Sequence, residues 1–140
     1  MRLFKQLTPR ELREVDELLH ERSYQKDEII FDEGDVGLGL FIIVSGRAKA
    51  VSSHAALQQL APEFCCGDFF GELSLFHESS RTARVVAVEP ARVVALFRTE
   101  FFSLLERNKG IGVKILFELS RAMCQRARSL ALGPQPPSKP

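Results

Sequence analysis

Hydrophobic residues in the first part of the chain recur at the spacing of an amphipathic helix. That spacing is carried by Leu12, Val15, Leu18 and Leu19. Thr8 suits the N-cap of this helix, Pro9 suits its first position, and Glu11 can complete a capping box. The pattern predicts one helix from residue 8 to about residue 22, packed as a lid on a core.

Between residues 28 and 97 the pattern changes to short runs rich in β-branched and aromatic residues, which are typical of strands. Glycines and the pair Glu89-Pro90 separate these runs, as expected where a chain turns. The predicted strands are Ile29–Phe31, 40–44, 47–51, Phe69–Phe70, 82–88 and Ala91–Phe97, with 57–60 as a weaker candidate. Many short strands joined by turns predict an antiparallel β-roll.

Two helices are predicted after the last strand. Thr99 suits the N-cap of a short helix, and Asn108 precedes a longer one that extends to about residue 130. The inward-facing residues of the short helix are expected to be Phe101, Leu104 and Leu105. The fold class is therefore mainly β, with an N-terminal helix and a C-terminal helix pair.

The longer helix carries apolar residues on two faces. One stripe consists of Ile111, Ile115, Leu119 and Ala122, and the other of Val113, Leu116, Phe117 and Met123. One roll can cover only one such face, so the second stripe predicts a further partner. We expect a homodimer through this helix, with an unidentified effector protein as another candidate partner.

The chain has 140 residues, of which 45% are hydrophobic and 26% charged, which is typical of one globular domain. We expect that domain to span residues 1–132, because the proline-rich residues 133–140 favour a disordered tail or linker. The formal net charge of +1 gives no global basic field for nucleic acid. No DNA-binding helix-turn-helix segment is recognised.

The N-terminal sequence lacks the apolar stretch of a secretory signal, and no run approaches the length of a membrane helix. These features predict a cytoplasmic protein without a membrane partner. Cys65, Cys66 and Cys124 are odd in number and are expected to be free thiols. No zinc pattern or known catalytic motif is present, so we expect no metal and no enzymatic activity.

The segment from Phe69 to Ala83 carries the most informative chemistry of the chain. Gly71 lets the backbone approach a ligand closely, Arg81 offers a planar fork to phosphate oxygens, and Glu72 can accept a hydrogen bond from a hydroxyl. A turn that follows Gly71 would add backbone N–H groups. A phosphodiester together with a free ribose hydroxyl would satisfy all of these groups, so the segment suits a cyclic ribonucleotide.

The same residues resemble the cyclic-nucleotide-binding domain family, in which Gly71-Glu72-Leu73 and Arg81-Thr82-Ala83 match the phosphate-binding cassette. The likeness extends from about Leu7 to about Met123. It includes Ile29-Ile30-Phe31, Glu33-Gly34-Asp35, Leu40-Phe41-Ile42-Ile43, Ser45-Gly46 and Gly67-Asp68. The family includes the catabolite activator protein and the regulatory subunit of cAMP-dependent protein kinase.

This resemblance implies an eight-stranded antiparallel jelly roll and a regulatory module without a bound cofactor. It favours cAMP as the ligand and also allows cGMP, for which Thr82 would be suited. The implied ligand-binding residues are Phe70, Gly71, Glu72, Leu73, Ser74, Ser80, Arg81, Thr82 and Ala83. The base would lie between the roll, at Ala50 and Ala61, and the long helix, at Gln125 and Arg126. Ligand binding would be signalled by movement of this helix.

Three alternatives stay open from the sequence alone. Arg81 and Glu72 can form a purely structural ion pair. The roll can be a dimerisation or interaction module with an inactive cassette. A haem-based sensor of the same fold would use His77 together with Cys65 or Cys66 as iron ligands.

Overall fold

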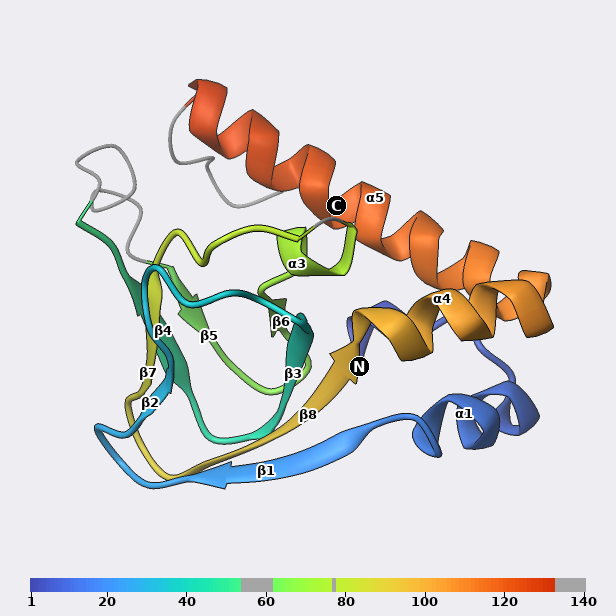
Figure 1. Ribbon diagram of the computed structural model, residues 1–140, viewed down its shortest axis with the longest axis horizontal. Coiled ribbons are helices and arrows are strands. Elements are labelled where there is room, and N and C mark those ends of the chain that lie inside the picture. Colours follow the sequence, from blue (N-terminus) through green and yellow to red (C-terminus); the bar gives the residue numbers. More distant parts are fainter. Residues whose placement is uncertain (54–61, 77, 133–140) are drawn as a thin grey trace, which may run out of the picture.

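The computed structural model describes residues 1–53, 62–76 and 78–132. Two four-stranded antiparallel sheets form the roll, in the strand orders β1-β8-β3-β6 and β2-β7-β4-β5 (Figure 1). Their strands are β1 (His20–Tyr24), β2 (Ile29–Phe31), β3 (Gly39–Ser45), β4 (Ala48–Val51), β5 (Glu63–Phe64), β6 (Phe69–Phe70), β7 (Arg84–Ala87) and β8 (Ala91–Phe97). The prediction of an eight-stranded roll is confirmed for the described residues.

Most predicted strands are found within two residues of their expected bounds, whereas β1 and β5 were not predicted. The candidate strand at 57–60 lies outside the described residues, as does the expected tail at 133–140. The helices of the described residues are η1 (Arg2–Phe4), α1 (Pro9–Asp16), α3 (Leu73–Phe76), α4 (Arg98–Arg107) and α5 (Lys109–Leu132). No helix among these ranges is both long and apolar enough to cross a membrane.

Helix α1 begins as predicted but ends earlier. The Thr8 side chain accepts a hydrogen bond from Glu11 N at 3.2 Å, and the Glu11 carboxylate accepts one from Thr8 N at 3.0 Å. The helix stops at Asp16, so the predicted extension to residue 22 is wrong. Residues 20–24 instead form β1, which pairs with β8 from His20↔Ala95 to Tyr24↔Ala91. The backbone N–H and C=O groups of residues 20–24 form hydrogen bonds with the edge of β8. This pairing outweighs the tendency of the side-chain spacing to form a helix.

The two C-terminal helices follow β8 directly. Helix α4 starts at Arg98, so the predicted N-cap at Thr99 is wrong; Thr99 lies in the first turn, and no side chain caps the helix. The Arg98 backbone N–H is already satisfied, because it donates to Leu38 O at 2.8 Å. Before α5, Asn108 Oδ1 accepts a hydrogen bond from Ile111 N at 3.3 Å, as a cap would.

Helix α5 runs along one side of the roll, beside α4 and above α3 (Figure 1). Its residues Ile111, Ile115 and Leu119 are fully buried in the main core. That core also contains Leu3 and Phe4 of η1, together with Phe101 and Leu104 of α4. The first predicted stripe therefore packs on the protein itself, with Ala122 partly buried at its end.

The second predicted stripe is only partly exposed. Val113 and Phe117 are 63% and 53% exposed. Leu116 packs partly against the core, and Met123 is partly buried beside a cavity described below. The prediction of a continuous exposed stripe of four residues is therefore wrong, because only Val113 and Phe117 of the four are exposed.

Candidate functional site

The turn between β6 and α3 brings the cassette backbone against the roll. Gly71 has φ +79°, a conformation that residues with a side chain rarely adopt, and a Cβ at this position would lie 2.5 Å from Arg81 Nη1. Helix α3 that follows is a single turn, in which Ser74 N donates to Gly71 O and Leu75 N to Glu72 O. Gly71 thus allows both the turn and the close approach of Arg81.

Arg81 is buried beside this turn and is 8% exposed. Its Nη1 donates to Gly71 O at 3.1 Å and its Nη2 to Gly39 O at 2.9 Å. The guanidinium carbon lies 4.1 Å from the centre of the Phe31 ring, a cation–π contact that holds the plane of the group. No ion pair of Arg81 is found among the described residues. A structural Arg81–Glu72 pair is therefore not formed.

Burial lowers the pKa of the Arg81 guanidinium, whereas the nearby carboxylates of Asp35 and Glu72 act in the opposite direction. The group stays protonated because its ordinary pKa is so high. Its two hydrogen bonds, to Gly71 O and Gly39 O, use only part of the five N–H groups of a guanidinium. A buried cation without an ion-pair partner favours an anionic ligand at this position.

Glu72, the predicted acceptor of a ribose hydroxyl, is 12% exposed at its side chain and forms an ion pair with Arg126 of α5. Arg126 also donates from Nη2 to Phe69 O at 2.7 Å and lies over the Phe69 ring at 4.9 Å. Arg126, which is predicted to lie beside the base, joins α5 to the cassette through these contacts. The helix and the cassette turn are therefore linked through the group that a ribose would use.

A cavity of about 880 Å³ lies between the cassette, the sheet β2-β7-β4-β5 and α5. It is lined by twelve of the thirteen residues that the sequence predicted: Ala50, Phe70, Gly71, Glu72, Leu73, Ser74, Ser80, Arg81, Thr82, Ala83, Gln125 and Arg126. The thirteenth, Ala61, lies outside the described residues. The structure therefore brings the predicted cassette and base-pocket residues together around one cavity, and their binding role stays a prediction.

The sequence reasoning missed several further residues of this cavity: Phe31, Ser52, Phe64, Val85 and Met123. Phe64 stacks on Phe70 with ring centres 5.0 Å apart, and Phe31 lies 5.8 Å from Phe70. Alternation along the strands could have revealed Ser52 and Val85. Ala50 and Ser52 are two residues apart in the chain, as are Ala83 and Val85, so each pair shares a strand face.

The proposed haem ligands receive no support from the described residues. Cys65 and Cys66 are free and exposed, as predicted for thiols, and Cys124 is also free. The Cys65 thiol lies 3.4 Å from Asp68 Oδ2, and hydrogen bonding to this carboxylate raises the pKa of Cys65. No group of three His, Cys, Asp or Glu suited to a metal occurs in the part of the chain that is described, and His77 lies outside it.

Comparison with known proteins identifies the family. The profile of the cyclic nucleotide-binding domain matches residues 21–108, and the chain belongs to this family. It is 34% identical over 126 residues to the cyclic AMP receptor protein of Thermus thermophilus, covering 86% of this chain and 56% of that protein. It is 32% identical over 109 residues to the cAMP-dependent protein kinase regulatory subunit of Colletotrichum orbiculare, covering 78% and 27%.

The fold agrees with this assignment. The crystal structure of the Thermus thermophilus catabolite activator protein superposes with a TM-score of 0.79 and 29% identity, covering 94% of this chain and 61% of that chain. The chain thus spans about half the length of the first of these relatives and about a quarter of the length of the kinase subunit.

Proposed function

We propose that this chain is a non-catalytic regulatory domain that binds cAMP in preference to cGMP. The observation that carries the proposal is the buried Arg81 guanidinium, which forms no ion pair with a carboxylate of the described residues and lies on the wall of the cavity beside Gly71 and Glu72. A cyclic phosphate would supply the missing negative charge. The names of the relatives support cAMP as the ligand.

The proposed arrangement places the phosphate at Arg81 and the Gly71 turn, and the ribose 2′-hydroxyl at Glu72. The remaining cavity, between Ala50 on the roll and Gln125 on α5, has an apolar floor of phenylalanine rings that suits a purine. Thr82 also lines this space. Its hydroxyl would accept a hydrogen bond from the guanine amino group, which adenine lacks at the same edge. Because of this contact, we propose that the protein also binds cGMP, but more weakly than cAMP.

Binding would be transmitted through α5. A ribose at Glu72 competes with Arg126 for the same carboxylate, so ligand binding and the position of the second half of α5 are coupled. We further propose that α5 forms a homodimer through Val113 and Phe117, the two large apolar side chains that it exposes in its first half. A cytoplasmic location is proposed with this function.

Isothermal titration with cAMP and cGMP tests the proposal. Arg81→Ala should weaken binding by about 2–5 kcal/mol, or at least roughly thirtyfold, because it removes the charged group opposite the phosphate. Arg81→Lys should recover only part of this loss, since an ammonium cannot form two parallel hydrogen bonds. Glu72→Ala should cost less than Arg81→Ala.

The matched control is Arg47→Ala, which removes an exposed arginine paired with Glu89 outside the cavity. It should bind both nucleotides as the parent does. If the parent chain bound neither nucleotide, the roll would be an interaction module with an inactive cassette. If Arg81→Ala bound as tightly as the parent, the ligand would not be held by this cassette.

A further inference from the structure

The hydrogen-bonded ladder between β4 and β7 ends at the pair Val51↔Arg84. One residue further along the chain, the side chain of Ser52 joins the end of β4 to the segment before β7. Its hydroxyl donates to Thr82 O at 2.9 Å, where a paired strand would have offered a backbone N–H. Ser52 is 6% exposed and lines the cavity. A buried hydroxyl therefore fixes the backbone of a residue that the proposed function places beside the base.

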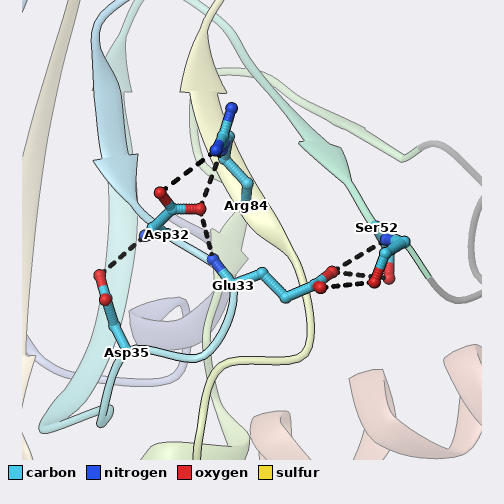
Figure 2. A network of polar contacts seen from close by, with 6 residues as sticks. Asp32, Glu33, Asp35, Ser52 and Arg84 are labelled. Carbon is cyan, nitrogen blue, oxygen red and sulfur yellow. Dashed lines mark hydrogen bonds and ion pairs between the residues drawn. The ribbon is translucent and has the colours of Figure 1, made fainter.

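The Glu33 carboxylate lies beside Ser52 (Figure 2). Glu33 Oε1 lies 3.3 Å from Ser52 Oγ and accepts a hydrogen bond from Ser53 N at 2.9 Å, while Oε2 accepts one from Ser53 Oγ at 2.5 Å. Ser52 Oγ is closer to Thr82 O, at 2.9 Å, than to Glu33 Oε1, at 3.3 Å, so we assign its single proton to the bond with Thr82 O. Glu33 thus fixes the chain at the end of β4 through Ser53, and the Ser52 hydroxyl fixes the backbone of Thr82.

The backbone of Arg81 is restrained separately. Gly34 N donates to Arg81 O at 2.8 Å, and Arg81 N donates to Asp35 O at 2.7 Å. The phosphate-binding residue would keep its position if the Ser52 hydroxyl were removed, because these bonds come from the loop between β2 and β3. The two neighbouring residues therefore depend on different supports: Arg81 on the loop backbone, and Thr82 on Ser52.

We propose that Ser52, at the strand end that Glu33 holds through Ser53, is a positioning residue for base selectivity. It holds Thr82 at a fixed place relative to Arg81, so that the Thr82 hydroxyl meets the base with good hydrogen-bond geometry. Hydrogen bonds weaken steeply with distance and angle, whereas the attraction between a guanidinium and a phosphate is less sensitive to small shifts. This inference rests on the proposed function, and in particular on a contact between Thr82 and guanine.

The test compares the dissociation constants for cGMP and cAMP in Ser52→Ala, Ser52→Thr, Glu33→Ala and Thr82→Ala. Ser52→Ala should weaken cGMP about tenfold and cAMP less than about threefold, since one well-oriented hydrogen bond contributes about that much. Thr82→Ala should change the cGMP to cAMP ratio in the same direction. Glu33→Ala should reproduce the Ser52→Ala ratio, and Ser52→Thr, which keeps the hydroxyl, should stay near the parent.

Glu89→Gln is the matched control, because Arg47 and Glu89 form an ion pair near the opposite end of the same two strands. It should leave the ratio unchanged. Amide hydrogen exchange of residues 82–84 without nucleotide should be faster in Ser52→Ala and unaltered in Glu89→Gln. A merely structural Ser52 would weaken both nucleotides equally, and that result would overturn the inference. A parent that binds neither nucleotide would overturn the proposed function as well.

Discussion

The two halves of α5 are held to the protein in different ways. In the first half, Ile111, Ile115 and Leu119 are fully buried against the core. Beyond Leu119, none of the helix residues whose side chains are described is buried. Here Met123 and Arg126 line the cavity, and the ion pair of Arg126 with Glu72 joins the helix to the cassette. One half is packed in the core, whereas the other half borders an open space.

This difference indicates where a ligand can act. Burial of large apolar side chains stabilises a contact by roughly 1.5–3 kcal/mol each, whereas partly exposed ion pairs contribute about 0–1 kcal/mol. The first half of α5 is therefore anchored. The second half is held more weakly, so the proposed ligand would be able to shift its position by contacting it.

The largest expected effect lies in the anchored half. Leu119→Ala should lower the free energy of unfolding by about 2–5 kcal/mol, because it leaves a hole in the core. Met123→Ala, four residues further along, should cost less than about 1 kcal/mol, since it borders a space that already exists. Urea denaturation of both variants measures this contrast. Equal losses would mean that the second half is packed as firmly as the first.

An intermediate effect is expected at the exposed face of the anchored half. Phe117→Glu should dissociate the proposed dimer, because burial of such an aromatic side chain contributes about 1.5–3 kcal/mol per protomer. Light scattering with and without cAMP measures the mass. Ser103→Glu, which adds the same charge at an exposed position of α4, is the control. A parent that stays monomeric at high micromolar concentration in both conditions would exclude this dimer.

The smallest effect on stability is expected at the cassette contact. Arg126→Ala should change the free energy of unfolding by no more than about 1 kcal/mol, because the ion pair is partly exposed. It should nevertheless speed amide hydrogen exchange in the second half of α5, while the first half stays protected. Arg128→Ala, an exposed arginine on the same helix, provides the comparison. Unchanged exchange would show that Arg126 does not hold this half.

Local patterns in the sequence predicted much of the fold. The Thr8-Pro9-Arg10-Glu11 signal marked the start of α1, because a capping box is made by residues close in the chain. Ala91–Phe97 was predicted with its observed bounds, since β-branched residues between turn signals leave few alternatives. Strand β5 has two residues and a weak local pattern, so only its pairing with β4 reveals it.

The sequence by itself determined the cassette, because Gly71, Glu72 and Arg81 carry both the local backbone requirement and the chemistry, and the residues around them match a family pattern. Only the tertiary structure decided where α1 ends. The backbone groups of His20–Tyr24 form hydrogen bonds with β8, and the spacing of side chains in the sequence does not reveal this pairing. The tertiary structure also decided that Arg126 meets Glu72 and that Ser52 supports Thr82. These contacts join residues 54 and 30 positions apart, and such partners are set by how the helices and sheets pack rather than by local sequence.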